Sequence, residues 1–196
     1  VDLEVSKNEV HALLGENGAG KTTLMKVLAG LVKPRAGEIF FEGQKVDIRS
    51  PEAAMKLGIG MVHQHFMLIP TLTVAQNVCL GLKSAGYPFP NLRKVAAEIS
   101  QLAEKYNLGI DPDVKVSLLS VGAQQRVEII KTLYRGARLL VLDEPTSVLT
   151  PQETEGLFNV INSLTAKGTS VIFISHKLNE VMTISKRVTV LRQGRV

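Results

Sequence analysis

The segment from Gly15 to Thr22 constrains this chain more than any other, because it reads Gly-Glu-Asn-Gly-Ala-Gly-Lys-Thr. This Gly-x-x-x-x-Gly-Lys-Thr pattern follows an apolar strand and opens a helix at Lys21, as phosphate-binding loops do. Small residues let consecutive backbone N–H groups curl around an anion, and the positive end of the helix dipole faces the same point. The alternative is a glycine-rich turn that only leads into a core helix.

The same loop predicts how a nucleoside triphosphate and Mg²⁺ are held. The Lys21 ammonium can reach β- and γ-phosphate oxygens, and the Thr22 hydroxyl is placed to ligate a Mg²⁺ that bridges them. The residues expected to bind the nucleotide are Gly15, Glu16, Asn17, Gly18, Ala19, Gly20, Lys21, Thr22 and Thr23.

A second motif, LLVLDEP at residues 139–145, places two carboxylates at the end of an apolar strand. Open α/β sheets build their ligand sites at this end of their strands. We expect Asp143 to hold Mg²⁺ and Glu144 to polarise an attacking water as a general base. An Asp-Glu pair in this position can also be a solvated turn or a helix N-cap.

Alternating strand and helix patterns predict an α/β fold with a mainly parallel sheet, interrupted by a helical insertion. Ser120 and Asn91 are expected to cap helices, the second with an apolar stripe that begins at Leu92. The first residues look like the end of a strand pair, and the last ten like a hairpin. Strands are expected at residues 9–14, 37–41, 59–62, 139–143 and 170–175, and helices at 21–31, 51–57, 91–103 and 120–135.

Composition excludes several classes of protein. No apolar run approaches the ~18 residues that cross a bilayer, so a membrane role would need a partner. Cys79 is the only cysteine, which excludes an internal disulfide and favours a reducing compartment. The net charge of +5 is spread among acidic residues and there is no Trp, so no nucleic-acid partner is expected. His11, His63 and His65 lack metal-site spacing.

Five segments occur in the order typical of the nucleotide-binding domain of ABC ATPases, which this chain resembles over its whole length. They are GENGAGKT, the glutamine of MVHQHF, LLSVGAQQR, LLVLDEP and the histidine of ISH. The resemblance implies a P-loop NTPase (RecA-like) core with a small antiparallel β part. It implies ATP as substrate, a core formed by residues 1–64 and 136–196, and a helical subdomain at 65–135.

The resemblance also implies roles for individual residues. Gln64 would sense Mg²⁺ and water, and His176 would contact the γ-phosphate, so the expected catalytic residues are Glu144, His176 and Gln64. The expected Mg²⁺ ligands are Thr22, Gln64 and Asp143. The signature residues would act in trans on ATP bound to a second ATPase domain in a head-to-tail dimer: Ser120, Val121, Gly122, Ala123 and Gln124.

The chain departs from the family pattern at the predicted dimer contacts. The usual LSGGQ is altered at Val121 and Ala123, and Thr150 stands where an aspartate commonly crosses the interface. Thr150, Pro151 and Glu153 also form a capping-box pattern. These departures favour weaker contacts between the signature and ATP bound to the second domain. They leave open the alternative that the chain is a half that holds ATP in a degenerate composite site while its partner does the hydrolysis. The aromatic residue that stacks on adenine in the family would lie upstream of Val1, and the ends look cut from something longer.

Within the family, several segments of the sequence are similar to those of bacterial importers of simple sugars and nucleosides. In such chains two ATPase halves are often fused, and this chain resembles the first half. This likeness implies permease subunits as partners, an extracytoplasmic solute-binding protein acting indirectly, and a peripheral location at the cytoplasmic face of the inner membrane. Phe66 and Met67 would border the groove that receives a permease helix. The competing hypothesis is a soluble, non-transport ABC ATPase, which would be expected to carry long coiled-coil or basic insertions.

Overall fold

The computed structural model describes residues 1–82 and 91–196, and its centre is a sheet of parallel strands. The strand order is β4-β5-β6-β1-β7, and each neighbouring pair runs parallel. A separate antiparallel pair joins β2 to β3. The strands are β1 (Val10–Leu14), β2 (Ile39–Phe41), β3 (Gln44–Val46), β4 (Ile59–Val62), β5 (Leu139–Asp143), β6 (Ser170–Ser175) and β7 (Arg187–Val190).

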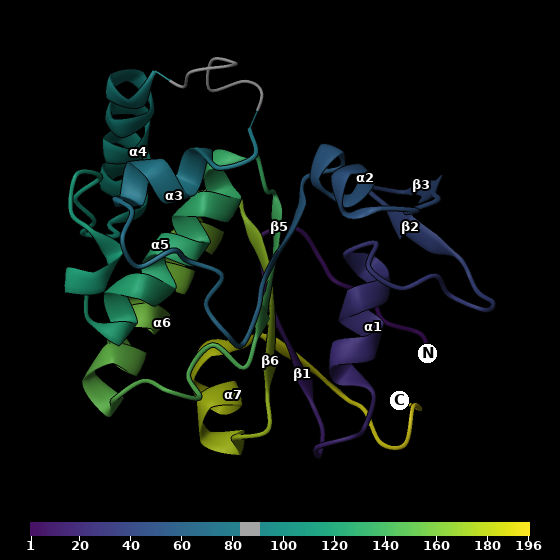
Figure 1. Cartoon of the computed structure of the whole chain (residues 1–196). Coiled ribbons are helices and arrows are strands. Elements are labelled where there is room, and N and C mark those ends of the chain that lie inside the picture. Colours follow the sequence, from purple (N-terminus) through teal and green to yellow (C-terminus); the bar gives the residue numbers. More distant parts are fainter. Residues whose placement is uncertain (83–90) are drawn as a thin grey trace.

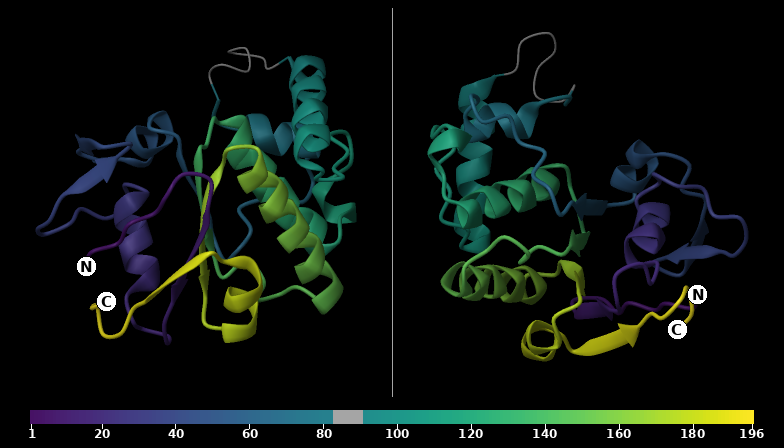
Figure 2. Two further views of the ribbon diagram at one scale, coloured as in Figure 1. Left: turned by 180° about the vertical axis from the view of Figure 1, so that it is seen from behind. Right: turned by 60° about the horizontal axis from the view of Figure 1, so that its bottom comes forward.

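Helices cover both faces of the sheet. Figures 1 and 2 show α3 to α6 packed on one face, and α1, α2 and the antiparallel pair on the other. The helices are α1 (Lys21–Leu28), α2 (Pro51–Lys56), α3 (Val74–Cys79), α4 (Leu92–Tyr106), α5 (Val121–Tyr134), α6 (Pro151–Ala166) and α7 (Leu178–Ile184). This confirms the predicted α/β class, its mainly parallel sheet and its small antiparallel part.

The sequence of strand β5 is continuously apolar because both faces of the strand are buried. Leu140 and Leu142 pack into the core shared with α3 to α6, whereas Leu139 and Val141 pack into the core shared with α1. Successive side chains of a strand point to opposite faces, so a strand covered on both faces needs apolar residues throughout. The centre of the sheet is therefore dry, and polar chemistry is confined to the strand ends.

Two predicted helices differ from the structure at one end. Helix α1 ends at Leu28 instead of residue 31, because the N–H of Leu31 turns back to bond the carbonyl of Lys26, and Leu31 is 48% exposed. Helix α4 is capped by Asn91 as expected, but Leu92 is 38% exposed in its first turn. The apolar periodicity correctly predicted both helices. It wrongly predicted that Leu31 and Leu92 belong to their buried faces.

Both predicted β features at the chain ends are wrong. The first eight residues form no strand, since Asn8 turns the chain in the left-handed region (φ 58°) just before β1. The expected hairpin is a tight turn with one antiparallel bridge, Arg192 to Arg195. Strand β7 pairs in parallel with β1 instead of with its own continuation, because β1 offers an apolar strand edge.

The predicted boundaries at 65 and 135 stay a prediction. Helices α3, α4 and α5 do lie together on one face, packed around Val95, Ile99 and Ile130. The predicted subdomain also includes residues 83–90, which lie outside the described residues.

Candidate nucleotide site

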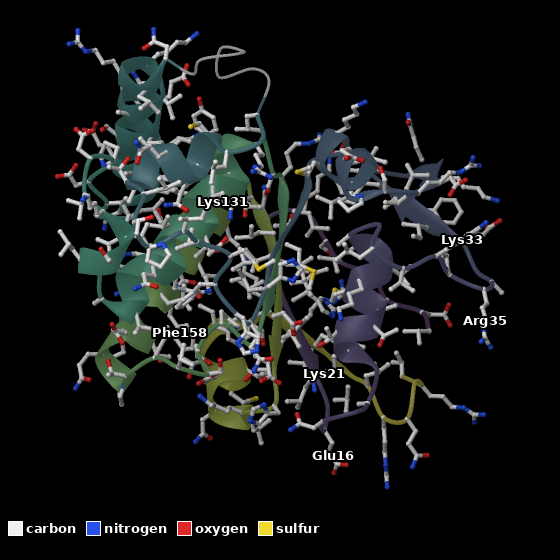
Figure 3. The ribbon with its side chains drawn as sticks, in the orientation of Figure 1. Glu16, Lys21, Lys33, Arg35, Lys131 and Phe158 are labelled. Carbon is white, nitrogen blue, oxygen red and sulfur yellow. The ribbon has the colours of Figure 1, made fainter. Side chains whose placement is uncertain are left out.

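The carboxyl ends of four parallel strands converge on one edge of the sheet, as expected for a ligand site in an α/β fold. The predicted phosphate-binding loop, Gly15 to Thr22, follows β1. Gln64 follows β4, Glu144 follows β5 and His176 follows β6. Figure 3 shows Lys21 and Glu16 near this edge, at the base of α1. Residues up to 161 positions apart in sequence are thus brought together by strand order alone.

The phosphate-binding loop is closed by its own lysine. Gly20 caps α1 with φ 102°, a conformation that side chains rarely adopt. The Lys21 ammonium lies across the loop and donates to the carbonyl of Gly15 at 2.7 Å and to that of Glu16 at 3.0 Å. Lys21 is 5% exposed, so these two hydrogen bonds are shielded from water and hold the cation at the loop. Phosphate oxygens can replace these carbonyls as its acceptors.

The other loop residues divide by exposure. Ala19 is buried, and its N–H bonds the carbonyl of Glu16 at 3.2 Å, which fixes the curl of the loop. Glu16, Asn17, Gly18 and Thr23 are exposed. The loop thus keeps a rigid inner side and presents an accessible outer side to a ligand.

Thr22 and Asp143 meet beside the loop. The Thr22 hydroxyl donates to the Asp143 carboxylate at 3.3 Å. Burial raises the pKa of Asp143, the Thr22 hydrogen bond opposes that rise, and the neighbouring Glu144 charge adds to it. A 5%-exposed carboxylate next to a hydroxyl, with a second carboxylate nearby, is an oxygen donor set suited to Mg²⁺.

Thr22 and Asp143 supply two side-chain oxygens at this point. Within residues 1–82 and 91–196, no group of three or more His, Cys, Asp or Glu side chains could hold a metal. Mg²⁺ is commonly held by one or two protein oxygens, several waters and substrate phosphates. The residues therefore fit a magnesium ion delivered with a triphosphate.

Glu144 is held between Gln64 and His176. Its Oε2 accepts from the Gln64 amide at 3.4 Å, and its Oε1 lies 3.1 Å from Nδ1 of His176. The Glu144 backbone adopts φ 47°, which is uncommon for a non-glycine residue and is found at functional sites. The structure thus brings together the three side chains predicted to be catalytic.

The signature residues lie elsewhere, at the start of α5 on the opposite sheet face from α1 (Figure 1). Ser120 is exposed and caps α5 by accepting from the N–H of Ala123 at 3.3 Å, and the Gln124 amide donates to the carbonyl of Leu119. Val121 is 38% exposed. Among the described residues, no hydrogen bond joins this segment to the phosphate-binding loop.

Sequence reasoning missed a contact that joins the signature to α6. Glu153 was expected only in the capping box of Thr150, which is present. Its carboxylate also accepts from the N–H of Gly122 at 2.9 Å, and the backbone hydrogen bonds from Gly122 and Thr150 lower its pKa. No pattern of neighbouring residues predicts this contact, because Gly122 and Glu153 lie 31 positions apart in the sequence.

The chain belongs to the ABC transporter family, whose family model matches residues 1–147. It is 49% identical to the nucleoside import ATP-binding protein NupA of Lactococcus lactis and 52% identical to the guanosine import ATP-binding protein NupO of Bacillus subtilis, each over the whole chain. It is 46% identical to the ribose import ATP-binding protein RbsA 3 of Rubrobacter xylanophilus. The chain spans about 38% to 40% of the length of these relatives.

Solved structures of ABC ATPases share the fold. The ADP conformation of the ATP-binding cassette MJ1267 superposes with a TM-score of 0.87 at 27% identity, covering all of this chain and 81% of that one. A dimeric post-hydrolysis structure of the cassette MJ0796 with ADP and Pi superposes with a TM-score of 0.80 at 27% identity, covering all of this chain and 86% of that one. The predicted family is confirmed.

Proposed function

We propose that this chain is the Mg²⁺-dependent ATPase domain of an importer of nucleosides or simple sugars. The observation that carries the proposal is the convergence of Lys21, Thr22 and Asp143 with Glu144 and His176 at one sheet edge. The names of the similar proteins, which import nucleosides, guanosine or ribose, favour transport over a soluble, non-transport ABC ATPase.

The residues of the site have separable tasks in hydrolysis. Lys21 and the loop amides neutralise the β- and γ-phosphate oxygens, and they orient the triphosphate. Thr22 and Asp143 would hold Mg²⁺, which supplies further positive charge to the phosphates when bound. Glu144 accepts a proton from the attacking water, while Gln64 and His176 fix the direction of its carboxylate.

A second ATPase domain would complete the site. Ser120 and Val121, at the start of α5, are exposed, where a γ-phosphate held by another domain can reach the Ser120 hydroxyl. The cassette MJ0796 is dimeric in its structure with ADP and Pi, which favours a second ATPase domain as a partner of this chain. Val121 and Ala123 depart from the usual signature, so a second candidate function remains. In that function the chain is an ATPase half that holds ATP in a degenerate composite site.

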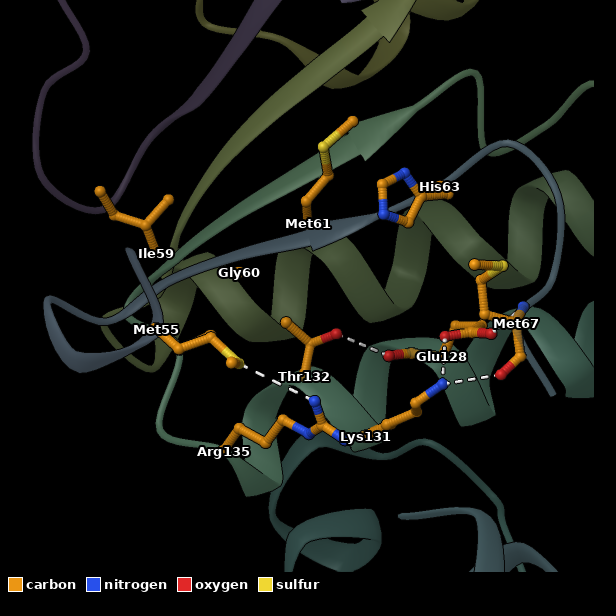
Figure 4. Close-up of a pocket in the computed structure, with 11 residues that line it drawn as sticks. Met55, Ile59, Gly60, Met61, His63, Met67, Glu128, Lys131, Thr132 and Arg135 are labelled. Atoms are coloured by element: carbon orange, nitrogen blue, oxygen red, sulfur yellow. Dashed lines mark hydrogen bonds and ion pairs between the residues drawn. The ribbon is translucent and has the colours of Figure 1, made fainter. Parts of the chain in front are cut away.

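Permease subunits are the proposed partners at a surface beside β4. A cavity of about 240 Å³ lies between α2, β4 and α5, lined by Met55, Met61 and Met67 among others (Figure 4). Met67 is 66% exposed, and its backbone is tied to α5 by Glu128 at 2.5 Å and Lys131 at 2.9 Å. Adaptable methionine side chains suit a surface that receives an amphipathic helix.

The cavity also connects such a helix to the nucleotide site. His63 and Met67 line it, and Gln64, which contacts Glu144, lies between them in sequence. Across residues 1–82 and 91–196, no helix has the length and apolar character needed to cross a bilayer. We propose that the chain lies at the cytoplasmic face of the inner membrane, bound to its permease, as the names of the similar import proteins favour, with a solute-binding protein acting on the other side.

Replacing the general base tests the proposal. In the full-length protein, Glu144→Gln should lower ATP turnover by about 10²- to 10⁴-fold, because the amide cannot accept the proton of the attacking water. The variant should retain ATP after gel filtration, since binding does not depend on that proton transfer. Turnover and retained nucleotide are measured together.

Glu155→Gln, an exposed change on α6, is the control and should hydrolyse ATP at the normal rate. Unchanged turnover in Glu144→Gln would refute the catalytic assignment. A wild-type protein that binds ATP and never turns it over would instead support the ATP-holding half.

A further inference from the structure

Glu180, on α7, makes a dense set of side-chain hydrogen bonds next to the nucleotide site. Its Oε2 accepts from the hydroxyl of Thr146 at 2.6 Å and from that of Ser175 at 3.2 Å. Its Oε1 accepts from the ammonium of Lys177 at 2.9 Å. The side chain is 13% exposed, so these hydrogen bonds are largely shielded from water.

The partners of Glu180 flank the two residues proposed to act on the attacking water. Thr146 lies two residues after Glu144, in the loop that follows β5. Ser175, the last residue of β6, stands directly before His176, and Lys177 stands directly after it in the loop that follows the strand. One carboxylate therefore holds the loop of the general base and the loop of its histidine.

The connection between the two loops is reinforced by further hydrogen bonds. The Lys177 ammonium also lies 3.4 Å from the carbonyl of Thr146, and the Lys177 N–H donates to the Ser175 hydroxyl at 3.0 Å. Thr146 and Ser175 are each 2% exposed. By contrast, the His176 side chain is 45% exposed, so its own packing leaves it free to turn.

We propose that Glu180 is a positioning residue for hydrolysis, which fixes His176 against Glu144 by tying together the loops that carry them. This proposal rests on the proposed function, because it concerns the geometry of the same reaction. Glu180 acts through its neighbours and does not touch the nucleotide. Losing its charge should loosen the 3.1 Å contact between His176 and Glu144 while the phosphate-binding loop stays intact.

Two variants remove the connection from opposite ends. Glu180→Gln keeps the length of the side chain but replaces one acceptor oxygen by a donor, so the two hydroxyls and the ammonium can no longer all be accepted. Thr146→Val keeps the shape of the threonine and removes its hydroxyl. Thr183→Ala is the matched control on α7, because within the part of the chain that the structure describes the Thr183 hydroxyl bonds only the carbonyl of Asn179 on its own helix.

The full-length protein is assayed with Mg²⁺ and ATP. We expect kcat to fall about tenfold in Glu180→Gln and about threefold in Thr146→Val, with KM for ATP changed by less than about twofold in both. Thr183→Ala should match the wild type. A purely structural defect would reduce the fraction of folded protein and its thermal stability instead of separating kcat from KM.

A second readout does not depend on turnover. With ¹⁵N-labelled histidine, and with His176→Gln to assign the signal, the imidazole nitrogens of His176 should shift in Glu180→Gln and Thr146→Val and stay in place in Thr183→Ala. Unmoved His176 signals with kcat within twofold of the wild type, in either variant that folds, would overturn the proposal. An inactive wild type would defeat the proposed function alone, since the His176 signals still report whether Glu180 positions that ring.

Discussion

At the scale of single residues, the buried His11 on β1 should make the free energy of unfolding depend on pH. His11 is 2% exposed, and its Nε2 lies 2.8 Å from the Thr189 hydroxyl on β7. Burial lowers the pKa of His11 below 6.5, outweighing the favourable effect of Glu9, whose Oε1 lies 3.4 Å from Nδ1. The native state therefore favours the neutral imidazole, which joins the edge strand β7 to β1 without a charge.

Acid should therefore weaken the fold by protonating His11. Below pH 6.5 the unfolded chain binds a proton at His11 more readily than the native chain, so the free energy of unfolding should fall as pH decreases. His11→Gln should reduce this slope, measured by urea denaturation at several values between about pH 7.5 and 5.5.

Exposed His65 supplies the control, since His65→Gln should retain the wild-type slope. Equal slopes in the wild type and in His11→Gln would contradict the prediction.

At the scale of elements, the close packing of α5 on β4 joins the helical layer to the sheet. Gly60 on β4 has no room for a larger residue, because an added Cβ would lie 2.1 Å from Cγ2 of Thr132 on α5 and 3.0 Å from Cβ of Ala137. The Thr132 hydroxyl is itself fixed to the carbonyl of Glu128 at 2.8 Å. The side chain therefore cannot turn away without losing a hydrogen bond.

Gly60→Ala should lower the free energy of unfolding by about 1–3 kcal/mol through overpacking. Gly156→Ala is its counterpart: Gly156 lies in α6 with nothing within 4 Å of the added Cβ, so the change should raise the free energy of unfolding by about 0.5–1 kcal/mol. Urea denaturation checks both. A Gly60→Ala variant whose free energy of unfolding is not lowered would show that the contact between α5 and β4 does not govern packing here.

The local patterns predicted these elements well where the signal lies within a few residues. Thr150 forms its expected capping box, and Ser120 and Asn91 cap their helices as expected. The ends of elements were harder to predict, as at residues 28–31, because tertiary contacts decide which turn is the last.

At the scale of the whole molecule, the proposed nucleotide site and the proposed permease surface use different parts of the same strand. The cavity beside Met67 is lined along β4, and Gln64 follows the carboxyl end of that strand. Among the lining residues, none belongs to the phosphate-binding loop. Movement of a docked helix would therefore reach the nucleotide through the segment between His63 and Met67.

A photo-reactive amino acid placed at Met67 in the assembled transporter should form an adduct with a permease subunit. The control position is Phe40 on β2, which is 62% exposed against 66% for Met67 but lies on the other side of the sheet. Adducts are detected by gel mobility and mass spectrometry. No adduct from Met67, or equal adducts from both positions, would count against the docking surface.

The catalytic assignments stay predictions, but their geometry is now defined. Sequence spacing alone predicted the loop around Lys21 and the pair Asp143 and Glu144, because each motif is a strand end with its own chemistry. It could not predict that Glu180 would bind Thr146 and the two neighbours of His176, since those positions become adjacent only when β5 and β6 pair.

The sequence by itself therefore determined the family, the α/β class, the glycine-rich loop before α1 and the helix caps at Asn91, Ser120 and Thr150, all of which depend on residues a few positions apart. Only the tertiary structure decided that β7 pairs in parallel with β1, that Glu153 binds the amide of Gly122, and that Glu180 joins two loops. The physical reason is that these contacts depend on strand order and on the competition among distant polar groups for partners, which local spacing does not encode.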